Sequence, residues 1–243
     1  MSGHLTIAGL GPGPDAQVTP EVTAALAAAS DIVGYGPYVA RVAPSGAARH
    51  ASDNRVELER ARLALDLAAA GGRVVVVSSG DPGVFAMAAA VFEAVADHPA
   101  RNTIAIDVLP GITAMLAAAA RIGAPLGHDF CAINLSDNLK PWPLIERRLQ
   151  LAAEADFAMG LYNPRSRARP AQFARALDIL RAACGPARPI VFARAVGSAD
   201  EAIAITDLGA ATPEMADMRT VVLVGSSTTQ RVGRWLYTPR SAG

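Results

Sequence analysis

Short apolar runs alternate with longer amphipathic stretches over most of the 243-residue chain. Short runs rich in branched apolar residues are typical of buried strands, and the longer stretches have helical spacing. This alternation predicts an α/β fold in which helices join parallel strands. The predicted strands are residues 5–10, 32–35, 73–78, 103–108, 130–135, 157–162, 190–195, 202–206 and 220–224. The predicted helices are residues 20–29, 38–42, 55–70, 83–95, 113–121, 143–153 and 170–183.

The two halves of the chain differ in this pattern. The last three predicted strands have little helix between them, so the second half is expected to form a mixed sheet. We predict a parallel domain over residues 1–112, a mixed domain over residues 113–243, and a hinge near Pro110 and Gly111.

Thr19 is expected to cap the first predicted helix, residues 20–29.

The boundaries of the helix at residues 55–70 also have candidate signals. Asp53 is a candidate cap at its start, and Gly71 with Gly72 is expected to end it.

Composition excludes several classes of protein. The 22 Lys and Arg residues balance the 22 Asp and Glu residues, so no overall field favours nucleic acid or an anionic membrane. The two cysteines, Cys131 and Cys184, are far apart, which suggests a reducing compartment and a cytoplasmic protein. No CxxC or HExxH pattern indicates a metal site, and no iron–sulfur cysteine cluster occurs. No signal peptide or membrane span is expected, because no apolar run is long enough.

A glycine loop, GLGPGPD at residues 9–15, leaves the first predicted strand. Gly9 and Gly11 fit the dinucleotide-binding fingerprint, but Pro14 stands where that fingerprint has its third glycine. Because proline has no amide hydrogen and fixes φ, Pro12 and Pro14 make the loop stiff and rich in carbonyls. Such a loop lacks the row of N–H donors that holds a pyrophosphate, so a nicotinamide site is disfavoured.

Two more loops follow predicted strands: SSGDPGVF at residues 78–85 and LPGITA at residues 109–114. Ligands of open α/β sheets bind at such strand ends, although glycine and proline also turn the chain in ordinary loops. The order and residues of the three loops resemble the tetrapyrrole (cobalamin-type) methyltransferase family, in which the first loop is GxGPG, the third strand ends in GDP, and the hinge carries PGIT or PGVS. The resemblance covers essentially the whole chain. It implies two α/β domains with S-adenosylmethionine held in a cleft between them.

The resemblance also implies which residues border the cofactor. They are Pro12, Ser79, Gly80, Asp81, Val84, Thr113, Ala114, Tyr162, Asn163, Ala195 and Thr220. Carbonyl groups of the proline loop suit the methionine ammonium of this cofactor. Asp81 has two interpretations, as a hydrogen-bond acceptor at the site or as the cap of the helix that follows.

Further stretches resemble one branch of the family. They are DIVGYGPYV at residues 31–39, residues 123–149, GLYNPRS at residues 160–166 and YTPR at residues 237–240. The implied activity is methylation of precorrin-3B at carbon 17 with ring contraction to precorrin-4, in cobalamin biosynthesis. Tyr35 is the implied substrate-binding residue of the first stretch. Gly36 stands where uroporphyrinogen methylases carry an aspartate, which argues against that branch, and Ala40 stands where relatives often have an acidic residue.

Three arginines, Arg165, Arg167 and Arg169, precede the helix predicted from residue 170. Cations at a helix N-terminus oppose its dipole by about a few tenths to 1 kcal/mol. They form either a solvated surface or a site for the acetate and propionate carboxylates of an anionic tetrapyrrole, which suits the forked guanidinium. We assign Arg165 to substrate binding.

The stretch LSDNLKPW, residues 135–142, places Ser136 and Asp137 in a polar loop after an apolar strand. The pair either starts the next helix through an Asx-type turn or works as an acid–base group. Methyl transfer from a sulfonium needs alignment, whereas ring contraction also needs a proton moved, so Asp137 with Ser136 is the predicted base. A structural role is expected for His128 and a core position for Cys131.

The resemblance further implies a homodimer, to which the apolar residues 115–120 are expected to contribute. Two alternatives stay open. The first is another methyltransferase of the same family, which acts on another corrinoid or tetrapyrrole carbon or on a protein in diphthamide synthesis. The second is a non-catalytic carrier. Whether the substrate is metal-free or carries cobalt also stays open.

Overall fold

The computed structural model describes residues 3–241 of the chain. It divides into two compact units, and the break falls between Thr113 and Ala114, one residue after the predicted boundary. We call them the first and second units and describe each by itself. Their assignment as separate domains stays a prediction.

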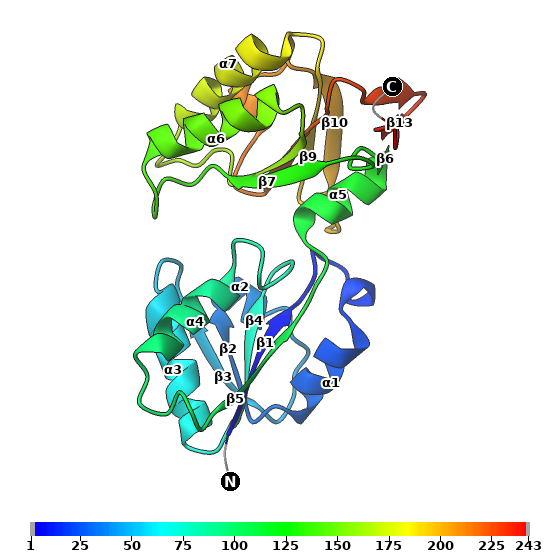
Figure 1. Cartoon of the computed structure of the whole chain (residues 1–243). Coiled ribbons are helices and arrows are strands. Elements are labelled where there is room, and N and C mark those ends of the chain that lie inside the picture. The colour runs from blue at the N-terminus through cyan, green and yellow to red at the C-terminus, as the bar shows by residue number, and fades with distance from the viewer. Residues whose placement is uncertain (1–2, 242–243) are drawn as a thin grey trace. The chain divides into compact units, whose positions relative to one another are not determined.

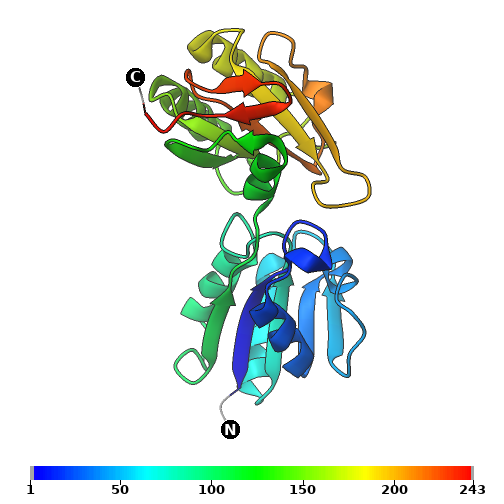
Figure 2. The ribbon, with the colours of Figure 1, turned by 90° about the vertical axis from the view of Figure 1, so that its right-hand side faces the viewer.

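The first unit contains a five-stranded sheet in the order β3-β2-β4-β1-β5, and every pair of neighbours is parallel. Figure 2 shows β3 and β5 at its opposite edges. Its strands are β1 (His4–Gly9), β2 (Asp31–Tyr35), β3 (Ala48–Ser52), β4 (Arg73–Ser78) and β5 (Ala105–Leu109). The run of valines in the central strand β4 is buried on both faces, as parallel sheets require.

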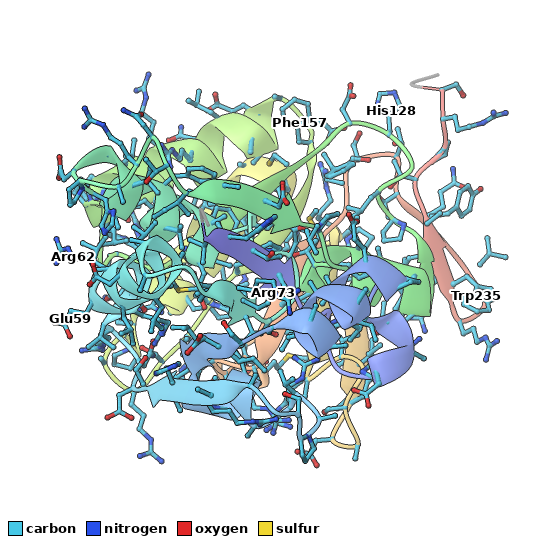
Figure 3. The ribbon with its side chains drawn as sticks, turned by 90° about the horizontal axis from the view of Figure 1, so that it is seen from below. Glu59, Arg62, Arg73, His128, Phe157 and Trp235 are labelled. Carbon is cyan, nitrogen blue, oxygen red and sulfur yellow. The ribbon has the colours of Figure 1, made fainter. Side chains whose placement is uncertain are left out.

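Helices cover both faces of this sheet (Figure 1). They are α1 (Pro20–Ala28), α2 (Gly36–Val39), α3 (Glu57–Ala69) and α4 (Met87–Ala96). One core lies under α3 and α4, and a second lies under α1 and α2. The charged side chains of Glu59 and Arg62 project from the outer face of α3 (Figure 3), whereas Leu65 and Ala68 face the sheet.

The second unit contains a five-stranded mixed sheet in the order β10-β9-β11-β8-β7. The pair β7–β8 is parallel and the other pairs are antiparallel, which confirms the predicted difference between the halves. Its strands are β7 (Phe130–Asn134), β8 (Ala158–Tyr162), β9 (Pro189–Arg194), β10 (Ala202–Asp207) and β11 (Thr220–Val224), and its helices are α5 (Ala114–Ile122), α6 (Trp142–Glu154) and α7 (Gln172–Cys184). A core that includes Phe173 and Phe192 joins α6 and α7 to this sheet.

Four strands were not predicted. Three form a small sheet, β12 (Gln230–Val232), β13 (Trp235–Tyr237) and β6 (Gly123–Ala124), which is visible in Figure 2. The fourth is β3, whose residues Ala48–Ser52 are exposed or half-buried at the sheet edge and therefore lack an apolar pattern. Because β3 precedes β4, the strand that ends in the GDP loop is the fourth strand and not the third.

The helix boundaries test the predicted caps. The side chain of Thr19 accepts a hydrogen bond from the Val22 amide, which confirms the first cap. Gly71, at a φ of 99°, follows the end of α3 as predicted. The cap assigned to Asp53 is wrong, because α3 begins after Val56 and has no side-chain cap.

Candidate functional site

The first unit gathers its three motif loops at one edge of the sheet. Strands β4, β1 and β5 are neighbours and parallel, so the loops that follow Ser78, Gly9 and Leu109 leave the same edge. Gly11 and Gly80 form a two-way backbone bridge, with N···O distances of 3.1 and 2.9 Å. The proline loop and the SGDP loop are thus fixed to each other.

Three glycines allow these loops to meet. A Cβ atom on Gly111 would lie 2.2 Å from the carbonyl oxygen of Gly80 and 2.8 Å from that of Gly9. A Cβ atom on Gly9 would lie 2.6 Å from the oxygen of Gly80. No side chain fits at either position without moving backbone, so glycine is required at residue 9 of the proline loop and at residue 111 of the PGIT loop.

Asp81 joins two of the loops through its carboxylate. One oxygen accepts from the Gly83 amide at 2.8 Å, and the other accepts from the Gly111 amide at 3.1 Å. The capping interpretation is wrong, because α4 begins after Ala86 and has no side-chain cap. Asp81 holds the SGDP loop against the PGIT loop.

The remaining predicted residues of the first unit lie in or beside these loops. Pro12, Ser79 and Val84 are half-buried, Gly80 is buried at a φ of 64°, and Thr113 is buried. Phe85, next to Val84, has a φ of 53°, a conformation that is strained for a residue with a side chain and is frequent at functional sites.

Tyr35 ends β2 at the same edge and packs edge-on against Tyr38 of α2, with ring centroids 5.2 Å apart. Burial and the neighbouring Tyr35 raise the pKa of the Tyr38 hydroxyl, and Arg41 and Ser79 only partly oppose this shift. The Tyr38 hydroxyl therefore stays protonated at neutral pH, and the tyrosine pair lies beside the SGDP loop.

In the second unit, the sheet topology also brings predicted residues to one edge. Strands β7, β8 and β9 run in one direction and β11 runs in the other. The ends of β8 and β9 and the start of β11 therefore share an edge, which carries Tyr162, Asn163, Ala195 and Thr220. The Ala195 amide donates to the Arg219 carbonyl at 2.8 Å, and Thr220 exchanges hydrogen bonds with Asp217.

Asn163 and Ser136 both donate hydrogen bonds to Asn134, a residue that was not predicted from the sequence. The Oδ1 atom of Asn134 accepts from the Ser136 amide at 2.9 Å and from the Asn163 side chain at 3.0 Å. The first of these bonds is an Asx turn. The turn is thus made by Asn134, and the expectation that Ser136 and Asp137 start the next helix is wrong, because α6 begins after Pro141 with no side-chain cap.

Asp137 lies in the same network through Arg169. The guanidinium of Arg169 is buried and donates to the carbonyls of Leu135 and Asn163 at 3.0 and 3.2 Å. Its Nε lies 3.6 Å from the Asp137 carboxylate, which also accepts from Gln172 at 3.2 Å. Arg169 is therefore a structural residue, contrary to both interpretations of the arginine cluster, while the Asp137 side chain stays 25% exposed.

Ala114 is the first residue of α5, and the side chain of Tyr162, which ends β8, reaches the start of that helix. The Tyr162 hydroxyl accepts from the Met115 amide at 3.0 Å, which supplies one of the first-turn donors of that helix with a partner. Asn163 and Ala195 have φ values of 51° and 50°. These two left-handed residues follow β8 and β9, which lie on either side of β11. Such conformations are frequent at functional sites, and no local sequence pattern predicts them here.

Arg165 is half-buried next to this edge. Its closest carboxylate is Glu214 at 4.0 Å, and its Nε is buried without a partner among residues 3–241. An arginine in this state can accept an anionic ligand without first breaking a strong ion pair. Arg167 is exposed, so the three arginines of the cluster have three different environments.

Other predicted residues lie away from this edge. His128 is exposed, 3.7 Å from the Asp129 carboxylate, and its label in Figure 3 marks the surface of the second unit. Cys131 packs against the core as expected, and burial raises the pKa of its thiol. Within residues 3–241 we find no cluster of three or more His, Cys, Asp or Glu residues that could hold a metal, and no helix long and apolar enough to cross a membrane.

Comparison with known proteins now identifies the chain's family. The family model of the tetrapyrrole (corrin/porphyrin) methylases matches residues 4–212. The chain belongs to this family. The resemblance seen in the three loops is therefore confirmed, and the tetrapyrrole methylase fold accounts for the parallel sheet followed by a mixed one.

Individual relatives are similar over the whole chain. A precorrin-3B C(17)-methyltransferase of a Sinorhizobium species is 54% identical over 99% of this chain and 97% of its own length. A probable cobalt-factor III C(17)-methyltransferase of Salmonella typhimurium is 41% identical over 97% of this chain and 98% of its own length.

Solved structures agree with the fold. The crystal structure of the methyltransferase CobJ has a TM-score of 0.96 and 66% identity, over 98% of this chain and 100% of that chain. A Thermus thermophilus uroporphyrin-III C-methyltransferase, solved with S-adenosylhomocysteine, has a TM-score of 0.70 at 20% identity, over 92% of this chain and 97% of that chain, and shows the fold alone.

Proposed function

We propose that the chain methylates precorrin-3B at carbon 17, with S-adenosylmethionine as methyl donor, and contracts the ring to precorrin-4 in cobalamin biosynthesis. The observation that carries this is the similarity to a precorrin-3B C(17)-methyltransferase over nearly all of both chains. The family, the order of the motif loops and their meeting at one sheet edge support it.

The residues at the first edge fit S-adenosylmethionine. The proline loop presents carbonyls without a row of amides, which suits an ammonium and a sulfonium better than a pyrophosphate. We assign the eleven residues named above, from Pro12 to Thr220, to the cofactor. The bound cofactor supplies an activated methyl group, so the protein needs no covalent nucleophile of its own.

The substrate is an anionic tetrapyrrole, and we assign Arg165 and Tyr35 to it. Arg165 supports this assignment because its guanidinium has a buried, unpartnered Nε and only a distant carboxylate. Tyr35 supplies an aromatic face and a hydroxyl at the first edge. Alignment of the reacting carbon by such contacts contributes up to ~7–11 kcal/mol of barrier lowering in favourable systems.

Ring contraction needs a group that removes a hydroxyl proton from the macrocycle, and we propose Asp137, assisted by Ser136. The carboxylate is accessible, and Arg169 and Gln172 hold its orientation. A positioned base of this kind contributes typically ~10²–10⁴-fold in rate. Ser136 lies next to it, with its backbone fixed by Asn134.

A second candidate function is the same methylation on a cobalt-containing substrate. The Salmonella relative is named for cobalt-factor III, although it is less similar than the Sinorhizobium relative. The protein side chains would perform the same steps on either substrate, so the residues of the site do not distinguish the two. The substrate must therefore be tested directly.

The experiment supplies methyl-labelled S-adenosylmethionine with either precorrin-3B or cobalt-factor III and analyses the products by mass and absorbance spectra. We expect one labelled methyl group and a contracted ring from precorrin-3B. Label transferred only to cobalt-factor III would select the second candidate, and label on neither would contradict the proposed reaction.

We also propose that the protein is a homodimer, which is implied by the family resemblance. The argument from residues 115–120 fails, because Met115 and Ala117 to Ala119 are buried against their own unit and the only large apolar side chain exposed there is Leu116. Exposed Val232 and Trp235 of the β12–β13 hairpin support an interface better. Light scattering that gives the single-chain mass of 25.0 kDa would contradict the dimer.

A further inference from the structure

One arginine binds the proline loop at three points. The guanidinium of Arg41, just after α2, donates to the carbonyls of Leu10 at 2.8 Å, Gly13 at 3.1 Å and Gly11 at 3.3 Å. These carbonyls belong to a loop in which Pro12 and Pro14 have removed two amide donors. A side chain from outside the loop therefore supplies donors that the loop itself lacks.

Arg41 has no carboxylate partner within 4.0 Å among residues 3–241. Burial lowers the pKa of its guanidinium, and the nearby Tyr38 and Asp15 oppose this shift. An arginine stays charged in proteins, so its half-buried charge is compensated mainly by the three carbonyl dipoles. The contact is thus a charged clamp on the loop.

The segment that carries Arg41 is itself fixed by a second arginine. Arg49 of β3 donates to the carbonyls of Val39, Val42 and Ala43 at 3.0, 2.9 and 2.7 Å. These three residues flank Arg41 in sequence. The sheet edge β3 therefore holds the segment, and the segment holds the loop.

We propose that Arg41 is a positioning residue for the cofactor: it holds the carbonyls of Leu10, Gly11 and Gly13 on its own guanidinium and so fixes the backbone of the proline loop in the conformation that receives S-adenosylmethionine. The inference rests on the proposed cofactor site. Arg41 acts through Leu10, Gly11 and Gly13. A loop with its carbonyls already fixed binds without first ordering itself, which is how preorganisation raises affinity.

The test is calorimetric titration of S-adenosylhomocysteine into the parent protein and into Arg41→Met and Arg41→Lys. If the competent loop conformation falls to about 1–10% of molecules without the clamp, the dissociation constant rises about 10- to 100-fold. Lysine keeps the charge but lacks the planar fork, so its effect lies between those of the parent and Arg41→Met. The KM for S-adenosylmethionine rises in parallel, while kcat at saturation stays within about twofold of the parental value.

A matched control is Arg181→Met in the second unit. Arg181 also donates to backbone carbonyls, those of Leu208 and Ala211, but it lies on α7 and outside the proposed site. We expect both methionine variants to lower the melting temperature, and only Arg41→Met to weaken nucleoside binding. Millimolar guanidinium added to Arg41→Ala restores binding if the loop needs only the clamp.

The outcomes separate this inference from the proposed function. Parental affinity in Arg41→Met, or equal losses in Arg41→Met and Arg181→Met, overturns the positioning role alone. If Arg41→Met does not fold, the affinity of Arg41→Lys and the guanidinium rescue of Arg41→Ala test the positioning role instead. Parental affinity in Arg41→Lys, together with failed rescue, overturns that role. A parent protein that binds no S-adenosylhomocysteine overturns the proposed cofactor and this inference with it.

Discussion

The candidate site residues of the two units are held in place by different kinds of contact. In the first unit the contacts are between backbone atoms of the three loops. Gly9, Gly80 and Gly111 approach one another closely, and Gly11 pairs with Gly80 through backbone hydrogen bonds. In the second unit, side chains form the connections, through Asn134, Asn163, Arg169 and Asp137.

This difference has a physical consequence. A contact between backbones tolerates no added Cβ atom, so it is rigid and depends on glycine alone. A network of side chains depends on charge and hydrogen-bond geometry, so it responds to pH and to isosteric substitution. We expect the cofactor residues of the first edge to be sensitive to added side-chain volume, and the substrate arginine and proposed base of the second edge, Arg165 and Asp137, to be sensitive to isosteric or charge-removing substitution.

The largest effect on cofactor binding is expected from Gly111→Ala. The new Cβ atom would lie 2.2 Å from the Gly80 oxygen, so the PGIT and SGDP loops must separate. Overpacking of this kind costs typically ~1–3 kcal/mol in stability, and we expect binding of S-adenosylhomocysteine to fall by about 100-fold or more. Calorimetry and thermal unfolding measure both effects.

Gly46→Ala is the control for that variant. A Cβ atom at Gly46 meets nothing within 4 Å, so stability should stay within about 0.5 kcal/mol of the parental value. Parental affinity in Gly111→Ala would show that the backbone contact is not what fixes the cofactor.

The next effect is expected from Arg169→Met in the second edge. Removal of the guanidinium leaves the carbonyls of Leu135 and Asn163 without this donor, which costs roughly 1–3 kcal/mol per buried group left unsatisfied. Urea unfolding should show this loss, and Arg167→Met, at an exposed position, should not. Equal stabilities of the two variants would contradict the structural role of Arg169.

Arg165→Ala should act on substrate and spare the cofactor. Loss of one charge-assisted contact of about 1.5 kcal/mol corresponds to about a tenfold rise in the KM for precorrin-3B. The affinity for S-adenosylhomocysteine should stay parental. A collapse of cofactor affinity with an unchanged substrate KM would remove Arg165 from the carboxylate site.

The smallest effect is a pH dependence of the second edge. Burial opposes ionisation of Asp217, but hydrogen bonds from Arg194 and Thr220, with the Arg219 amide and the Arg194 charge, lower its pKa overall. A lowered folded-state pKa gives stability that is complete above the unfolded value near 3.8 and is lost as pH falls through the folded value. Urea midpoints between pH 6 and about pH 3 should therefore fall less in Asp217→Asn than in the parent. Parallel pH profiles would contradict this role.

The comparison also explains what the sequence could predict. The first edge was predictable, because its glycines and prolines lie in three short motifs, each directly after an apolar strand. The second edge was predicted only in part. Asn163 and Asn134 are 29 residues apart, and Arg169 reaches Leu135 across 34, so no local pattern marks these contacts.

The helix starts and one long-range contact were also missed, for two different reasons. Asp53 was predicted to cap a helix and Asp81 had capping as one of its two interpretations, but α3 and α4 begin several residues after them. Arg41 was not singled out at all, because the carbonyls it binds lie about 30 residues earlier in the chain. Only the sheet order brings α2 next to the proline loop.

The central claim is that the cofactor site and the proton-moving site are separable, and Asp137→Asn tests it most directly. Asparagine keeps the shape and much of the hydrogen bonding of the side chain but removes its basicity. We predict parental affinity for S-adenosylhomocysteine, together with a methylated product that keeps an uncontracted ring or an overall rate lower by ~10²–10⁴-fold, measured by mass and absorbance spectra of the product. Contracted product formed at the parental rate would contradict the claim and leave a substrate group or water as the base.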